Sequence, residues 1–98
     1  MKSRHIAQFL LANGSVTDEQ IARWRDAAHL IAALGSMGTD GVSAILKFDG
    51  GRPVAPYTVV VSGPKLGDAF FRKDGDDYVA LLQDAVDFYS SEVWSKRK

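Results

Sequence analysis

The sequence predicts one α+β domain with two N-terminal helices, a three-stranded antiparallel sheet and a long C-terminal amphipathic helix packed on one sheet face, in the order α-α-β-β-β-α. Three observations predict this class. Apolar residues recur with a helical period near both ends of the chain, strand-forming residues fill the middle, and the links between the strands are short. Consecutive strands with short links pair antiparallel, and helices then cover one face. The 98 residues suit a single core.

The two helices at the start of the chain are predicted over residues 3–13 and 18–34. Asn13-Gly14 is typical of a left-handed C-terminal cap. Thr17 and Gln20 have the spacing of a capping box, which is the clearest local signal in the chain. Gly35 should end the second helix, and the glycine-rich stretch 35–41 should be a mobile connector. The residues expected on the apolar arc of the second helix are Ile21, Trp24, Ala27, Ala28, Ile31 and Leu34.

Three segments are predicted to form the sheet: residues 42–48 and 57–62 as a hairpin, and residues 69–73 as a shorter third strand. Because successive side chains of a strand point to opposite faces of the sheet, one face of the predicted sheet is apolar and should face the core. The opposite face still carries Ile45 and Val60, which is more apolar surface than a solvated sheet face usually shows. We expect the first helix to cover this face, with a second copy of the chain as the alternative.

The last helix is predicted over residues 76–94, with Asp74 or Asp76 as its N-cap. Apolar residues cover about half of its circumference, and the remainder is polar, with three aspartates, a glutamine and a serine. A calcium loop in the preceding acidic turn is disfavoured, because its ligand positions would fall on apolar or basic residues; no metal site is expected. Two further candidate contact residues, Ser91 and Trp94, are placed on the polar side of this helix. Trp94 is expected either to lie under the basic tail 96–98 or to meet a partner.

Charge is segregated although the formal net charge is zero. Residues 47–73 hold five basic and two acidic side chains, whereas residues 74–95 hold six acidic and none that is basic. The last helix therefore carries an acidic stripe that includes Asp84 and Asp87. The basic set lies on the hairpin and the third strand: Lys47, Arg52, Lys65, Arg72 and Lys73. The ordinary interpretation of both is a solvated surface with local ion pairs.

The residue types disfavour catalysis. Cysteine is absent, and the chain has only two histidines, His5 and His29. The paired serines near the end of the chain have no histidine close in sequence, and no phosphate-binding glycine motif is complete. We therefore expect no enzyme activity and no cofactor. No apolar run is long enough to span a membrane and no cleavage signal follows the basic start, so we expect a cytoplasmic protein.

Without its first helix, the order α-β-β-β-α over residues 18–94 resembles that of double-stranded-RNA-binding domains. The resemblance is one of element order. That family grips phosphates with a basic cluster at the start of its last helix, where this chain has Asp74, Asp76 and Asp77, so the binding site is not carried over. The first two helices also allow a helix-turn-helix hypothesis, but Asp18 and Glu19 would open the recognition helix.

The function that these observations favour is a small, non-catalytic protein-interaction or regulatory module of the antitoxin or immunity-protein kind. It would self-associate as a homodimer, bind a basic protein partner, or both. The alternative is a nucleic-acid-binding domain that uses the basic set on the hairpin and third strand. The residues expected to contact a partner are Asp84, Asp87, Ser91, Trp94, Ile45 and Val60.

Overall fold

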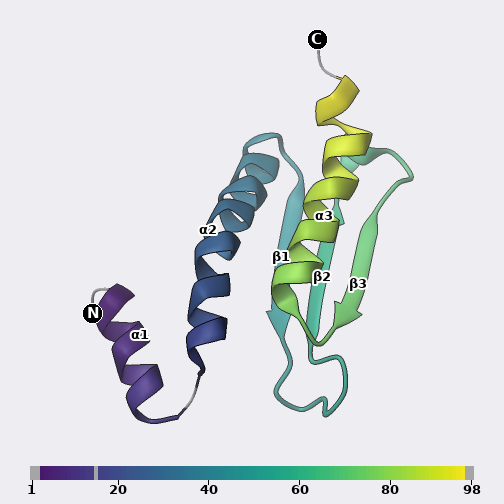
Figure 1. The fold of residues 1–98 in the computed structure, drawn as a ribbon. Coiled ribbons are helices and arrows are strands. Elements are labelled where there is room, and N and C mark those ends of the chain that lie inside the picture. The colour runs from purple at the N-terminus through teal and green to yellow at the C-terminus, as the bar shows by residue number, and fades with distance from the viewer. Residues whose placement is uncertain (1–2, 15, 97–98) are drawn as a thin grey trace.

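The computed structural model describes residues 3–14 and 16–96, and these confirm the predicted α+β order. The strands form one antiparallel sheet in the order β1-β2-β3 (Figure 1). Short 3-10 turns follow β2 and the last helix. The elements are α1 (Ser3–Ala12), α2 (Asp18–Thr39), β1 (Ser43–Phe48), β2 (Tyr57–Ser62), β3 (Phe71–Gly75) and α3 (Tyr78–Glu92), with 3-10 turns at Pro64–Leu66 and Trp94–Lys96.

The start of α2 is the capping box that the sequence predicts. The Gln20 backbone N–H donates to Thr17 Oγ1 at 3.2 Å, and the Thr17 N–H donates to Gln20 Oε1 at 2.8 Å. Both bonds satisfy donors that the first turn of a helix leaves without partners. Gly14 has φ of 75°, so the left-handed cap predicted after α1 is confirmed as well.

The predicted end of α2 is wrong, because the helix continues through Gly35 to Thr39 instead of becoming a connector. Met37 lies in this extra segment and its side chain is fully buried in the core. Burying such a side chain gains roughly 1.5–3 kcal/mol, which offsets the helical cost of about 1 kcal/mol at each glycine. Gly41, with φ of 90°, turns the chain into β1.

The core lies between the sheet and two helices, α2 and α3. In the register, Leu46 of β1 and Lys73 of β3 flank Val59 of β2, so alternate residues of each strand share the covered face. Leu82 and Tyr89 of α3 are fully buried against this face, which confirms the predicted apolar half of the last helix. The buried residues of the core are Met37, Val42, Val59, Val61, Leu66, Leu81, Leu82, Ala85, Tyr89 and Val93.

The joint between β3 and α3 differs in detail from the prediction. The third strand is shifted by two residues toward the C-terminus, so Asp74 and Gly75 belong to β3. A Cβ atom on Gly75 would lie 3.2 Å from Leu81 Cδ2, so a residue without a side chain suits this close approach. The N-cap of α3 is Asp77, whose Oδ1 accepts the N–H groups of Val79 and Ala80, and not Asp74 or Asp76.

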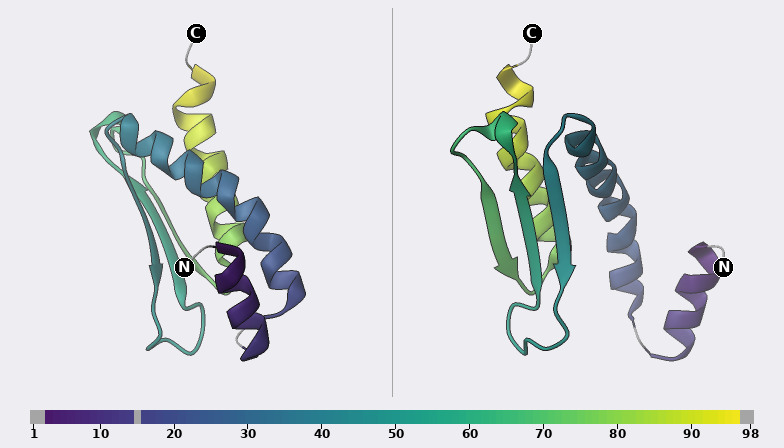
Figure 2. Two further views of the ribbon diagram at one scale, coloured as in Figure 1. Left: turned by 90° about the vertical axis from the view of Figure 1, so that its left-hand side faces the viewer. Right: turned by 180° about the vertical axis from the view of Figure 1, so that it is seen from behind.

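The expected cover for the outer sheet face is also wrong. Figures 1 and 2 show α2 and α3 on the same side of the sheet, and α1 beyond α2 on the side away from the strands. In Figure 1, α1 lies beside the N-terminal half of α2, which has itself left the sheet edge. The radius of gyration is 15.2 Å, against about 13 Å for a compact chain of this length. The two N-terminal helices therefore extend from the body as an arm.

Candidate binding site

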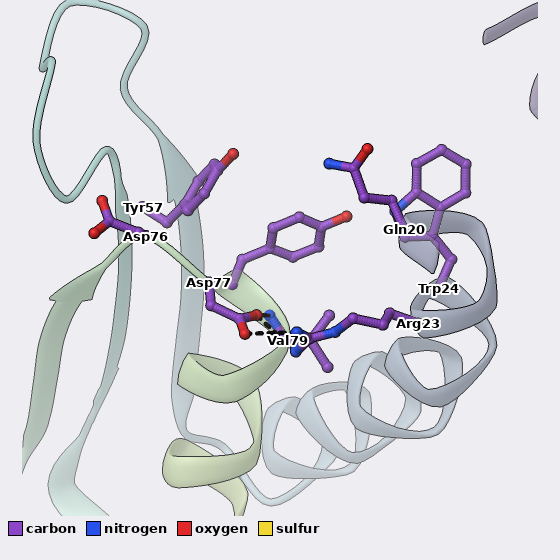
Figure 3. A pocket seen from close by; sticks show the side chains of 8 residues that line it. Gln20, Arg23, Trp24, Tyr57, Asp76, Asp77 and Val79 are labelled. Carbon is purple, nitrogen blue, oxygen red and sulfur yellow. Dashed lines mark hydrogen bonds and ion pairs between the residues drawn. The ribbon is translucent and has the colours of Figure 1, made fainter. Parts of the chain in front are cut away.

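A cleft of about 240 Å³ opens where the first turns of α2 and α3 face the start of β2 (Figure 3). Figure 3 shows Tyr57 on the sheet side of this cleft, with Trp24 and Gln20 on the α2 side. The residues that line it are Gln20, Arg23, Trp24, Tyr57, Asp76, Asp77, Tyr78 and Val79.

One side of the cleft is an ion pair that joins α2 to the N-cap of α3. Arg23 of α2 approaches Asp77 with both terminal nitrogens, Nη1 to Oδ2 at 2.7 Å and Nη2 to Oδ1 at 2.8 Å. This bidentate geometry gives Arg–carboxylate pairs their directionality. Because Asp77 also caps α3, one carboxylate fixes the start of that helix and ties it to α2.

The environment of Asp77 favours its ionised form. Partial burial is the largest single influence and raises the pKa of the carboxyl. The N–H groups of Ala80 and Val79 and the guanidinium of Arg23 act in the opposite direction, and together they hold the pKa of Asp77 below its usual range. The ion pair is therefore intact at neutral pH.

Two aromatic rings that line the cleft, those of Tyr57 and Tyr78, pack together with a third, that of Phe48. The ring centroids of Tyr57 and Tyr78 lie 5.2 Å apart at 74°, in an edge-to-face arrangement. Phe48, at the end of β1, contacts both rings at 5.0 and 5.1 Å. Such pairs contribute about 0.5–1.5 kcal/mol beyond the area they bury. Asp76 stands beside them, and its Oδ1 accepts the Ala55 N–H at 2.8 Å.

Sequence reasoning missed this cleft. The sequence predicts only a capping role for Gln20 and only an apolar-arc position for Trp24, whereas Tyr57 and Tyr78 begin elements that lie far apart in the sequence. One signal was present: aromatic residues stand at the first position of both β2 and α3, and tyrosine there suits a half-exposed rim. Their meeting with α2 depends on tertiary packing.

The acidic residues predicted to meet a partner have contacts within the chain. Asp84 Oδ2 lies 2.6 Å from Lys73 Nζ, and Asp87 accepts a hydrogen bond from Gln83 at 2.9 Å. Ser91 is exposed on the same helix. The acidic stripe is thus partly neutralised by β3.

Trp94 does not lie on the polar side of α3, because the helix ends at Glu92 and the next turn is 3-10. This change of twist moves the indole inward. Its Nε1 donates to Asp40 at 3.2 Å, and its ring packs edge to face on Tyr89. Two residues of the basic tail predicted to cover it, Arg97 and Lys98, lie outside the described residues.

The other two predicted contact residues lie on the outer sheet face, where Ile45 pairs with Val60. Ile45 is 53% exposed and Val60 is half-buried. Phe70, just before β3, is also exposed. This face is open in the part of the chain that the structure describes, but its apolar area is interrupted by polar neighbours.

The basic set is divided between two faces of the sheet. Lys73 points toward α3, whereas Lys47, Arg52 and Arg72 meet acidic residues on the outer side. Arg52 donates to Thr58 Oγ1 at 2.8 Å, and Thr58 in turn donates to Asp74. Lys65 lies apart from the strands, in the 3-10 turn after β2. The predicted nucleic-acid set therefore does not form one continuous basic surface.

A second candidate surface is the arm, defined as α1 together with the outward side of α2. Ile6, Phe9 and Leu11 of α1 are 41%, 58% and 38% exposed. On α2 the predicted apolar arc is divided: Ala27 is buried and Leu34 packs on the core, whereas Ala28 is exposed and Ile31 is 49% exposed.

Among the described residues, no three His, Cys, Asp or Glu side chains gather closely enough to hold a metal ion. Within the same residues, no helix combines the length and apolarity needed to cross a membrane. Comparison of the chain with protein-family models, with curated proteins and with solved structures found no match.

Proposed function

We propose that the protein is a non-catalytic interaction module that self-associates through its arm, with a second copy of the chain as the occupant. The observation that carries this proposal is the uncovered apolar surface of α1, a helix that extends from the body instead of packing on it (Figure 2). The absence of cysteine suits a reducing compartment, so we place this activity in the cytoplasm.

The length of α1 argues that it needs a partner surface. It has ten residues, and isolated helices shorter than about 12–15 residues are marginal in water. Ile6 and Phe9 stand on one side of this helix and remain largely exposed. Covering each such side chain would gain up to roughly 1.5–3 kcal/mol. Association with a second copy of the chain would bury these side chains, gain this free energy and keep α1 helical.

The outward side of α2 has the shape of a helix-packing surface. Ala28, Ile31, Ala32 and Gly35 are exposed at the spacing i, i+3, i+4 and i+7, which places them on one stripe. Small residues in such a stripe let two helix backbones approach closely.

The stripe is complementary to itself. If two copies of α2 cross antiparallel about Ala28, Ile21 of one copy falls opposite Gly35 of the other, so a large side chain meets a small one on both sides of the axis. A surface of this kind suits the isologous contact of a two-fold dimer. The formal net charge of zero adds no overall repulsion between the copies.

Sedimentation of matched variants tests the proposal. Ile31 and Ile45 are both about half exposed, at 49% and 53%, but lie on the arm and on the outer sheet face. We expect a concentration-dependent dimer that Ile31→Glu converts to monomer and Ile45→Glu leaves intact. Dissociation by Ile45→Glu alone would favour the sheet as the interface. A wild-type protein that stays monomeric at high concentration would overturn self-association altogether.

The other functions expected from the sequence have weaker support. A basic partner on α3 would compete with Lys73 for Asp84. Nucleic acid on the outer sheet face would meet Asp49 and Asp74 among the basic side chains. Both remain hypotheses, and salt-dependent binding to random duplex RNA and DNA is the measurement that checks the second.

A further inference from the structure

We infer that the cleft between α2 and α3 binds an organic cation, an alkylammonium or guanidinium head group, presented by a lysine or arginine side chain or by a free amine. The cleft is lined by residues of a single chain.

The charge of the cleft selects against anions. Its lining holds one basic residue, Arg23, and two acidic residues, Asp76 and Asp77. The guanidinium of Arg23 is already held by both oxygens of Asp77. An incoming carboxylate or phosphate would have to displace Asp77 from that pair. The Asp76 carboxylate is directed away from the opening, toward the loop between β1 and β2, where it accepts the Ala55 N–H (Figure 3). A cation leaves the ion pair in place.

The aromatic lining favours a cation over a neutral group of the same size. The rings of Trp24, Tyr57 and Tyr78 belong to three different elements and border one cleft. The negative faces of aromatic rings attract ammonium and guanidinium groups, most strongly at tryptophan. Figure 3 shows Trp24 and Tyr57 on opposite sides of the opening, so aromatic side chains lie on both sides of it.

The size of the cleft limits the ligand to a head group or one side chain. Its volume of about 240 Å³ lies below the range of roughly 300–1,000 Å³ that is typical of sites for drug-sized molecules. The Arg23–Asp77 pair borders it on one side. A larger ligand would have to extend outward beyond the cleft.

Nuclear magnetic resonance provides an internal control, because the chain has two tryptophans. The indole N–H of Trp24 lies at the cleft, whereas that of Trp94 donates to Asp40 at the other end of the core. We expect tetramethylammonium to shift the Trp24 signal in a saturable manner and to leave the Trp94 signal in place. 2,2-Dimethylpropan-1-ol, a neutral molecule of similar shape, should bind about fivefold more weakly. Equal binding of the two probes, or no shift at Trp24, would overturn the inference.

A pair of ring variants provides the second control. Tyr78→Leu removes an aromatic ring from the cleft, whereas Phe70→Leu removes an exposed ring that lies just before β3. We expect the first to weaken tetramethylammonium binding severalfold and the second to leave it unchanged; equal effects would contradict the inference. Titrations with capped lysine and with methylammonium distinguish the two sources of the cationic head group. Tighter binding of capped lysine would identify a peptide side chain as the ligand, and tighter binding of methylammonium would identify a free amine.

Discussion

Tyr89 and Trp94 meet edge to face, with ring centroids 4.9 Å apart, and donate to the same oxygen of Asp40. The Tyr89 hydroxyl lies 2.9 Å from Asp40 Oδ2, and the Trp94 Nε1 lies 3.2 Å from it. This arrangement ties the residue that caps α2 to the end of α3. The Asp40 carboxylate thus holds the ends of the two helices together, at the end of the molecule opposite the cleft.

Replacing Tyr89 by phenylalanine should lower the free energy of unfolding by about 1–3 kcal/mol, because hydrogen bonds to charged acceptors are among the stronger ones. The ring keeps its packing, so the change isolates the hydroxyl. Urea unfolding followed by tryptophan fluorescence measures the effect. The control is Tyr57→Phe at the half-exposed rim of the cleft, for which we expect a change within about 0.5 kcal/mol. Equal small losses at both positions would contradict a structural role for the Asp40 contact.

Two glycines near the end of α2 should respond in opposite directions to alanine. A Cβ atom would meet nothing within 4 Å at either Gly38 or Gly41, but only Gly41 has a positive φ, of 90°. Gly38→Ala should stabilise by about 0.4–1 kcal/mol, because alanine restricts the unfolded chain and suits a helix. Gly41→Ala should destabilise by about 1 kcal/mol or more. Thermal unfolding of both variants checks this, and destabilisation by Gly38→Ala would mean that α2 ends earlier.

The stability of the protein should depend on pH through Asp77. Its pKa in the folded state is lowered from the usual 3.8, so its contribution is present above that value and is lost as the pH falls through the folded pKa. Asp77→Asn keeps a capping oxygen but loses the charge that pairs with Arg23. The wild type should therefore exceed the variant in stability near pH 7, and the difference should shrink below about pH 4. Urea unfolding at a series of pH values tests this; a constant difference would exclude the ionised pair as its cause.

The pKa of Asp74 should rise toward its usual value when Thr58 is replaced by valine. The hydrogen bond from Thr58 is the largest influence that lowers this pKa; partial burial raises it, and Arg52 and Arg72 lower it further. Valine keeps the shape of the buried side chain but cannot donate. Titration of the carboxyl carbons by nuclear magnetic resonance measures the change. The pKa of Asp77, which depends on other neighbours, should not move.

Local sequence signals were sufficient for much of the fold. The Thr17–Gln20 capping box, the left-handed Gly14 and the strand at Tyr57–Ser62 depend on neighbours within a few residues, and each is present in the structure. The apolar half of α3 was also readable, since helical periodicity fixes which side chains share a face. Where a structural feature depends only on residues within one or two helical turns of each other, the sequence is sufficient to predict it.

The features that the sequence misjudged depend on contacts between distant residues. Gly35 predicts a helix end, but burial of the Met37 side chain stabilises a further turn of α2. Trp94 reads as a polar-face residue, yet its inward turn depends on Asp40, 54 positions away.

The sequence by itself therefore determined which segments are helices and strands and which side chains are apolar, because those properties arise from local backbone preference and hydrophobic periodicity. Only the tertiary structure decided that Trp24, Tyr57 and Tyr78 border one cleft and that α1 stands clear of the sheet. Those relationships follow from the angle at which α2 leaves the sheet edge. That angle depends on how whole faces pack, which no short stretch of residues encodes.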